Sequence, residues 1–174
     1  VLAGRVQLAA VLQARRQWRA AAAEFRRALD AAPDPADPVA RLALEGLVGS
    51  LVSAGELDAA GAEIERVLAE RPDDLEARVL YAGNLARRGQ ADKAQAELDR
   101  VIAKDPGLVR AWIVLAGVLN DPAARIERLE AGVAANPSNA DLGLLLGSAL
   151  EQAGRFDEAI GVYEQMTQRF PKSR

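Results

Sequence analysis

Five prolines recur along the chain at an interval close to 34 residues, and each follows a segment with helical periodicity. They are Pro33, Pro72, Pro106, Pro137 and Pro171, separated by 39, 34, 31 and 34 residues. Proline ends a helix because it lacks a backbone N–H and its ring clashes with the preceding turn. Self-similarity at this period is typical of helical repeat proteins, in which each unit packs on its neighbours.

The segment before each proline predicts an amphipathic helix. Eight residues before the prolines the side chain is always apolar: Phe25, Ile64, Leu98, Leu129 and Tyr163. Twelve residues before, it is small in every unit except the fourth: Ala21, Ala60, Ala94, Arg125 and Ala159. Five residues before, it is small or apolar: Ala28, Val67, Val101, Gly132 and Met166. These three positions share one helical face, so the helix packs along that face.

A second helical pattern precedes each of these helices, and a tight turn separates the two. The turn holds Gly55, Gly89 or Gly154, with Arg16 in the first unit, and glycine supplies the positive φ that ends a helix. The first helices carry apolar residues at three- and four-residue steps: Leu8 and Leu12; Leu44, Leu47 and Leu51; Tyr81 and Leu85; Trp112, Leu115 and Leu119; Leu146 and Leu150. The sequence therefore predicts five helical hairpins.

Acidic and amide side chains stand where the first helices are expected to begin. Asp37 precedes Pro38, Asp73 and Asp74 precede Leu75, and Asn139 follows Pro137 and Ser138. We interpret these side chains as N-caps, which accept hydrogen bonds from free backbone N–H groups.

The fourth unit is three residues short, and NDPAAR at residues 120–125 replaces its glycine turn. We expect Asp121 to cap the next helix and Pro122 to open it. Arg125 occupies a position of close helix approach, so either the packing there opens or the Arg125 side chain extends outward.

These residues resemble the tetratricopeptide repeat family, whose pattern is W-x2-L-G-x2-Y followed by A-x3-F-x2-A-x4-P. The last unit matches best, through Leu146-Gly147, Leu150, Gly154, Phe156, Ala159, Tyr163, Met166 and Pro171. The resemblance implies an all-α fold, a right-handed α-α superhelix (solenoid) of ten helices. It predicts a single repeat domain over residues 1–174, with repeats near 2–35, 38–74, 75–108, 109–139 and 140–174, as an excerpt of a longer protein.

Composition argues against catalysis. The chain has no histidine and no cysteine, which excludes disulfides, thiolate or imidazole metal ligands and the usual serine triad. No glycine-rich phosphate-binding motif follows a strand pattern. Paired carboxylates such as Asp157 and Glu158 fit caps or solvated helix faces better than acid and base roles. We therefore predict no enzyme activity, no cofactor and no metal.

The charge and hydropathy of the chain argue against a nucleic acid partner and a membrane span, but they do not identify the cellular compartment. The net charge is −3 and the basic residues are scattered, so no nucleic acid partner is expected. The longest apolar runs fall short of the roughly 20 residues that span a bilayer. The arginine-rich composition indicates a GC-rich, bacterial genome. A chain without cysteine fits cytoplasm and periplasm, and the similarity to envelope arrays slightly favours the periplasm.

The resemblance implies that the first helices line a concave groove that binds a protein or peptide partner. The groove positions are Val6, Ala10 and Gln13; Leu42, Glu45, Gly49 and Val52; Glu76, Val79, Gly83 and Arg87; Arg110, Ile113, Gly117 and Asn120; Asp141, Leu144, Ser148 and Glu151. They are apolar or small at the centre, which favours a hydrophobic or amphipathic segment. The lysine and asparagine clamp of chaperone-binding members is missing, because Val6, Ala10 and Gly49 occupy its places.

Three of the groove positions are glycines inside predicted helices: Gly49, Gly83 and Gly117. Each costs about 1 kcal/mol of helix stability relative to alanine. Two explanations remain open: the glycines deepen the groove for a partner, or they let two helices cross closely.

Three functions remain open. The first is a non-enzymatic protein-binding scaffold in a bacterial envelope or exopolysaccharide secretion assembly. The alternatives are a structural spacer between domains and a regulatory module of an enzyme encoded outside this segment. We also expect self-association through the C-terminal helix, because Ile160, Tyr163, Met166 and Phe170 form an apolar stripe that a further hairpin would cover.

Overall fold

The computed structural model describes residues 2–32, 34 and 37–169, and this part of the chain consists of ten α-helices joined by short turns, without a strand. The helices are α1 (Leu2–Ala14), α2 (Trp18–Asp30), α3 (Pro38–Ser53), α4 (Leu57–Glu70), α5 (Leu75–Arg87), α6 (Ala91–Lys104), α7 (Val109–Val118), α8 (Pro122–Ala135), α9 (Ala140–Gln152) and α10 (Phe156–Arg169). The predicted all-α class and the predicted helix order are confirmed. Of the five repeating prolines, Pro33 and Pro171 lie outside the described residues.

The turns inside four of the five hairpins depend on one left-handed residue. Gly55, Gly89 and Gly154 have φ of 79°, 76° and 74°, and Arg16 takes the same conformation with φ of 58°. A side chain at such φ is uncommon and costs backbone strain. Arg16 therefore provides the left-handed turn residue of the first hairpin, as glycine does in the second, third and fifth hairpins, and its place in the sequence predicts this role.

The predicted caps Asp37, Asp74 and Asn139 are in place at the starts of α3, α5 and α9, whereas Asp73 is not the cap residue of α5. The Asp37 carboxylate accepts a hydrogen bond from the Val39 N–H at 2.7 Å, with Pro38 at the first helical position. Asp74 accepts from the Ala77 N–H at 3.0 Å. These carboxylates thus satisfy backbone donors that the helix itself leaves free.

The short fourth hairpin replaces the glycine turn with side-chain hydrogen bonds. Asp121 accepts from the Ala124 N–H at 2.8 Å, and Pro122 opens α8. The Arg125 guanidinium donates twice to the Leu119 carbonyl, at 3.2 Å from Nε and 2.7 Å from Nη2. The Arg125 side chain is partly buried and satisfies a carbonyl just past the end of α7, where a cation is favourable.

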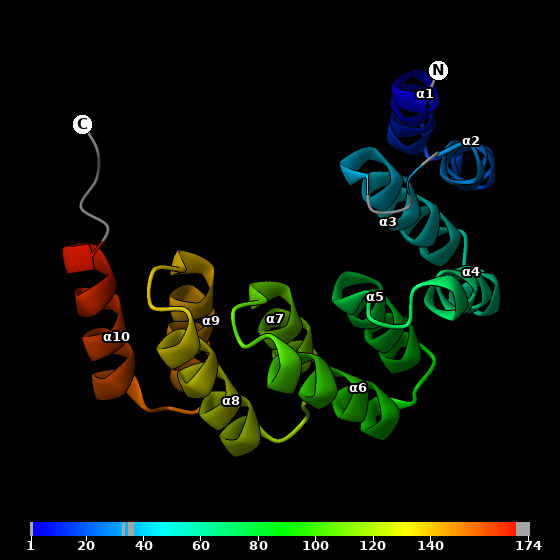
Figure 1. Cartoon of the computed structure of the whole chain (residues 1–174). Helices are drawn as coiled ribbons and strands as arrows, with labels where there is room; N and C mark the ends of the chain where they lie inside the picture. The colour runs from blue at the N-terminus through cyan, green and yellow to red at the C-terminus, as the bar shows by residue number, and fades with distance from the viewer. Residues whose placement is uncertain (1, 33, 35–36, 170–174) are drawn as a thin grey trace. The chain divides into compact units, whose positions relative to one another are not determined.

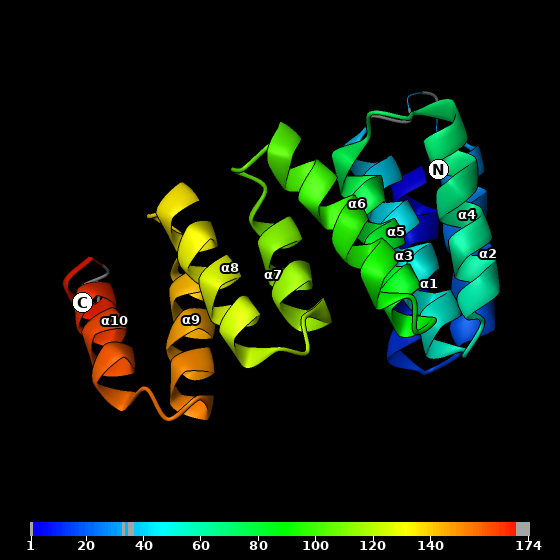
Figure 2. The ribbon, with the colours of Figure 1, turned by 90° about the horizontal axis from the view of Figure 1, so that it is seen from below.

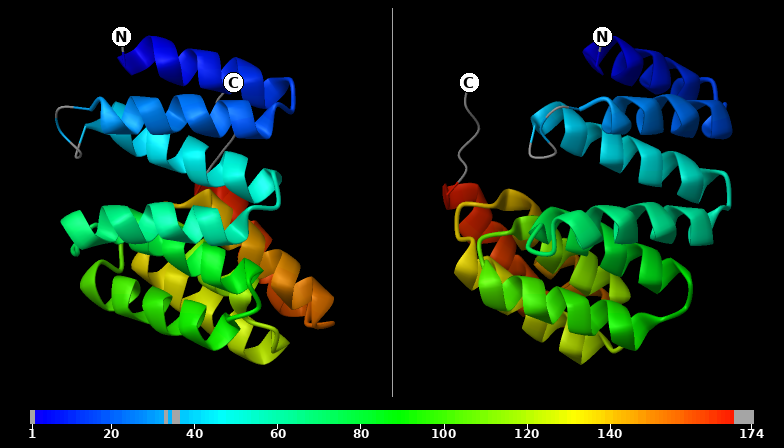
Figure 3. Two further views of the ribbon diagram at one scale, coloured as in Figure 1. Left: turned by 90° about the vertical axis from the view of Figure 1, so that its right-hand side faces the viewer. Right: turned by 45° about the vertical axis from the view of Figure 1, so that its right-hand side comes forward.

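The chain divides into two compact units, Val1–Arg88 and Gly89–Arg174. In the first unit, α1 to α5 follow one another as packed helices, and α3 lies between α2 and α4 (Figures 1 and 3). Buried leucine, valine and alanine side chains fill the space between them, and the Phe25 ring of α2 lies against Gly46 of α3. A glycine at this place lets the ring approach the α3 backbone closely.

The first unit also contains a buried polar network between α1 and α3. The Gln13 amide donates to the Ser50 hydroxyl at 2.9 Å, and that hydroxyl donates to the Gly46 carbonyl at 2.7 Å. Ser50 is fully buried, so these bonds satisfy a group that would otherwise be costly to bury. Gln13 was a predicted groove position, and here its side chain is engaged in packing two repeats together.

In the second unit, α6 to α10 also pack in chain order, with α9 between α8 and α10 (Figure 2). Two glycines of α9, Gly143 and Gly147, let α10 approach closely. The Met166 side chain lies against Gly143, and the Tyr163 ring lies against Gly147. Burial raises the pKa of the Tyr163 hydroxyl, and the nearby Glu151 carboxylate raises it further.

This packing corrects part of the C-terminal prediction. Tyr163 and Met166 were expected on the outward stripe of the last helix, but they point inward because the two glycines of α9 leave room for them. Ile160 is exposed, as expected. Phe170 lies outside the described residues.

The first helix departs from its predicted packing. Leu8 was expected to face the core, yet it is 49% exposed, whereas Val6, a predicted groove position, is 5% exposed. The reason is that α1 packs on α2 and α3 through the face that carries Val6 and Ala9.

Candidate partner-binding surface

The second unit presents exposed apolar side chains on two neighbouring first helices, α7 and α9. Ile113 of α7 and Leu144 of α9 occupy the same repeat position and are 36% and 53% exposed. Leu145, which sequence reasoning missed, is 37% exposed beside Leu144. Because α7 and α9 are in contact, we call these three side chains, with Gly117, the α7–α9 face.

Polar groups lie at equivalent positions around this face. One helical turn before the apolar residues stand Arg110 and Asp141, and one turn after Leu144 stands Ser148. Asn120 and Asp141 are exposed, and Arg110 and Ser148 are partly buried. A surface that is apolar at its centre and charged at its rim is typical of protein-binding sites.

The first unit carries a smaller surface of the same kind on α3. Leu42 is 52% exposed, Gly49 is exposed two helical turns further along, and Glu45 and Val52 are partly buried beside them. On α5, the predicted positions Glu76, Gly83 and Arg87 are at least partly accessible, and the Arg87 guanidinium donates to the Gly83 carbonyl at 3.1 Å.

Val79 does not belong to an accessible surface. Its side chain is 1% exposed, although Ile113 and Leu144 occupy the same position in their repeats. Packing encloses the Val79 side chain, so a partner cannot reach it in this structure. We therefore remove Val79 from the predicted groove set.

The structure separates the two explanations for the groove glycines. A methyl group added at Gly49 or Gly117 would meet no atom within 4 Å, and one at Gly83 would meet only the far end of the Arg87 side chain, at 3.4 Å. Close helix crossing does not require these three glycines. It does require Gly46, Gly143 and Gly147, where a methyl group would overlap a packed side chain.

Alanine at Gly117 is therefore expected to stabilise the protein, by about 0.5–1 kcal/mol, because it reduces the backbone entropy of the unfolded chain without a steric conflict. Urea denaturation followed by far-ultraviolet circular dichroism measures the change. Gly143→Ala is the matched control, since its methyl group would lie 2.7 Å from the Met166 sulfur and is expected to give no such gain. A loss of stability in Gly117→Ala would contradict the open surface at this position.

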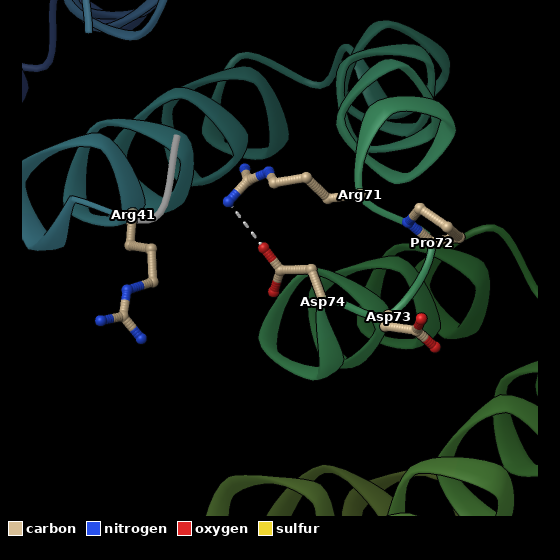
Figure 4. Close-up of a pocket in the computed structure, with 5 residues that line it drawn as sticks. All are labelled: Arg41, Arg71, Pro72, Asp73 and Asp74. Carbon is tan, nitrogen blue, oxygen red and sulfur yellow. Dashed lines mark ion pairs between the residues drawn. The ribbon is translucent and has the colours of Figure 1, made fainter. Parts of the chain in front are cut away.

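An open depression of about 500 Å³ lies at the beginnings of α3 and α5, lined by Arg41, Arg71, Pro72, Asp73 and Asp74 (Figure 4). Arg71 points toward Asp74 and forms an ion pair of 2.9 Å, whereas Arg41 and Asp73 point away from that pair (Figure 4). Asp74 also caps α5. These charged groups serve the loop and the helix start, and they do not form an acid–base pair directed at a common substrate position.

Within the described residues, acidic side chains do not gather in groups that could hold a metal ion. None of the helices described is both long and apolar enough to cross a membrane. The lowered pKa of Glu158 has a structural cause, the hydrogen bonds from Arg155 in the first turn of α10.

An array of α-helical hairpins that exposes apolar residues on its first helices is a helical-repeat scaffold for protein interactions. Two sequence profiles described as tetratricopeptide repeats match the chain, one over residues 51–117 and the other over 6–75 and 118–174. The chain belongs to the tetratricopeptide repeat family. No curated protein matches the sequence.

Solved structures of other proteins have a fold similar to that of this chain. The thermophilic TPR protein TTC0263 of Thermus thermophilus aligns with a TM-score of 0.68 at 20% identity, over 99% of this chain and 93% of its own. A MamA protein aligns at 0.61 and 17% identity, over 97% and 91%. YrrB, described as a TPR protein with an unusual peptide-binding site, aligns at 0.55 and 16% identity, over 97% and 86%. The fold is thus the all-α tetratricopeptide repeat solenoid.

Proposed function

We propose that this chain is a non-enzymatic scaffold whose α7–α9 face binds a hydrophobic or amphipathic segment of a partner protein. The observation that carries the proposal is the exposure of Ile113 and Leu144 at one repeat position on adjacent helices. Burying such side chains against a partner gains about 25 cal/mol for each Å² of apolar surface. The description of YrrB as peptide-binding supports the same kind of role.

The glycines support a role in binding. Gly49 and Gly117 weaken their helices, and no neighbouring group in the described structure needs the space that they leave. A partner backbone can approach a helix more closely where a side chain is missing. We infer that Gly117 gives a bound segment room beside Ile113.

Selection from a displayed library of random peptides tests this function directly. We expect enriched peptides to carry aliphatic or aromatic residues at helical or alternating spacing. The variant Ile113→Glu/Leu144→Glu is expected to bind these peptides at least about tenfold more weakly, because it places charges at the centre of the contact. Fluorescence anisotropy with labelled peptides measures the dissociation constants.

The matched control is Ala134→Glu, which adds a charge of the same kind at an exposed position of α8, a helix that contributes no residue to the α7–α9 face. Its affinity should equal that of the unchanged protein. If Ile113→Glu/Leu144→Glu binds the peptides as tightly as the unchanged protein does, the binding site is not the α7–α9 face. Failure to enrich any peptide would favour the structural spacer, and a role in envelope or exopolysaccharide assembly remains a prediction from the family resemblance.

A further inference from the structure

The turn between α1 and α2 concentrates positive charge at one end of the first hairpin. Residues 15–20 include Arg15, Arg16 and Arg19 and no acidic residue. The side chains of all three arginines are exposed, and in the described part of the chain Arg15 and Arg16 form no ion pair. This turn therefore differs in charge from a turn whose polar groups are satisfied locally.

Two of these arginines stand where the glycine-containing hairpins have other residues. Arg16 takes the place of Gly55, Gly89 and Gly154, and Arg19 takes the place of Asp58, Asp92 and Asp157. Both replacements oppose the local structure. Arg16 has a φ of 58°, a conformation that costs strain when a side chain is present. Arg19 adds a cation to the first turn of α2, where a negative charge is the favourable one. Turn formation therefore does not account for either arginine.

Arg16 and Arg19 line the same open depression, which has a volume of about 340 Å³. Gln17, Trp18, Ala20 and Ala54 complete its lining. Ala54 belongs to the turn between α3 and α4, and Figure 3 shows the two turns side by side at the same end of their hairpins. All of these residues belong to the first unit. We call the depression between the two turns the Arg16/Arg19 site.

The Arg16/Arg19 site fits a carboxylate beside an apolar side chain. The Arg19 Nε donates to the Glu56 carboxylate at 2.5 Å, which fixes the side chain, and the side chain is still 81% exposed. A guanidinium has five N–H donors in a planar fork that matches the two oxygens of a carboxylate. One bond to Glu56 therefore leaves donors for a second acid. The partly buried Trp18 offers an aromatic surface in the same depression.

The small extent of the charge favours a protein segment over a nucleic acid. A nucleic acid contacts several phosphates in succession and is bound by a basic stripe. The other arginines of the first hairpin are already paired, Arg5 and Arg27 with Glu24 and Arg26 with Glu63. In this hairpin the available positive charge is thus confined to the turn, where a few carboxylates neutralise it.

We propose that the Arg16/Arg19 site binds an acidic segment of a partner protein, in which carboxylates pair with the two arginines and a neighbouring apolar side chain packs on Trp18. The site belongs to the first unit and acts through charge, whereas the α7–α9 face belongs to the second unit and is apolar at its centre. It is therefore a second binding surface, and it does not depend on the function proposed for the first.

Peptide selection on a protein with a blocked α7–α9 face tests the site. The variant Ile113→Glu/Leu144→Glu serves as the background and is presented to a displayed library of random peptides. We expect the enriched peptides to be rich in aspartate and glutamate and to carry at least one aliphatic or aromatic residue. Their affinity, measured by fluorescence anisotropy of labelled copies, should fall as the salt concentration rises because salt screens the exposed charges.

Arg16→Gly in this background is expected to change stability and binding in opposite directions. The melting temperature should rise, because glycine adopts the left-handed conformation without strain. The acidic peptides should bind at least about threefold more weakly, because one cation is lost. A role of Arg16 in the turn alone would give no change in binding. The experiment thus separates a structural role from a role in recognition.

Arg16→Gly/Arg19→Gln should weaken binding at least about tenfold. Glutamine keeps a donor for Glu56 and removes the charge of Arg19. The matched control is Lys93→Gln/Arg100→Gln, which removes two positive charges at exposed positions of α6. Circular dichroism checks that each variant keeps its helix content. The control should bind the acidic peptides as tightly as the background does.

Four results would overturn the proposal. The first is a selection that enriches no acidic peptide, and the second is equal binding by Arg16→Gly/Arg19→Gln and the background. The third is an equal loss in the α6 control, which indicates attraction by overall charge. The fourth is a single-stranded DNA of about 20 nucleotides that displaces the peptides at equal affinity, which indicates a site for polyanions in general. The α7–α9 face is blocked throughout, so these outcomes are independent of its role.

Discussion

Replacing Trp112 by alanine is expected to lower the free energy of unfolding by about 3–5 kcal/mol, the range for removing a large aromatic side chain from a protein core. The Trp112 side chain is 5% exposed, and a methyl group at Gly132 would lie only 3.1 Å from its ring. Because Gly132 has no side chain, it cannot fill the space that the indole leaves beside α8. The cavity should therefore persist, and the loss of unfolding free energy should lie near the upper end of this range.

Trp112→Phe is the control for this change, because it keeps a ring in the core and removes the indole N–H. The Trp112 Nε1 donates to the Pro106 carbonyl at 2.9 Å, and Asn136 donates to the same carbonyl at 2.9 Å. The carbonyl therefore keeps one partner, and the expected loss from the missing hydrogen bond is about 1 kcal/mol. Urea denaturation measures both changes, and hydrogen exchange should place the loss of protection in α7 and α8. Equal losses for phenylalanine and alanine would show that the ring does not fill the core.

Alanine at Gly46 is expected to destabilise the protein by about 1–3 kcal/mol, the usual cost of adding a methyl group to a well-packed core. The added group would overlap the Phe25 ring, which is 3% exposed and surrounded by the core of the first unit. The ring cannot swing into solvent without leaving a cavity. Either the ring or the α2 backbone must shift.

Gly49→Ala provides a control on the same helix, three residues further along. Its methyl group would meet open space, so we expect a gain of about 0.5–1 kcal/mol from helix propensity alone. Thermal unfolding followed by circular dichroism distinguishes the two variants. The melting temperature should fall in Gly46→Ala and rise in Gly49→Ala. A gain in both variants would mean that Phe25 does not rest on the α3 backbone.

The sequence predicts the helices well because the signals that end and begin them are local. A proline, a left-handed residue or a capping carboxylate acts within one turn of its own position. Arg16 illustrates this, since its place in the repeat predicted a turn and its φ is 58°. Asp121 and Pro122 also formed the predicted start of α8, although the usual glycine is missing from that hairpin.

The surfaces are predicted less well because a helical pattern does not specify which neighbours are present. Val79 and Ile113 hold the same repeat position, yet one is buried and the other exposed. Tyr163 points inward because Gly147 on the facing helix leaves space, which periodicity within α10 alone does not reveal. The G-x-x-x-G spacing in α9 was the available signal. For Leu145 the signal was the run of three leucines at 144–146, which is wider than one packing face requires.

The order in which the helices pack has a consequence for biosynthesis. In each unit, contacts among the described residues join a helix to the next helix or to the one after it. Contacts so close in sequence form quickly, since little loop-closure entropy opposes them. As the chain leaves the ribosome, each new helix can pack on a helix that has already been synthesised and folded. We therefore expect folding to proceed during translation, with no long segment exposed while it waits for a distant partner.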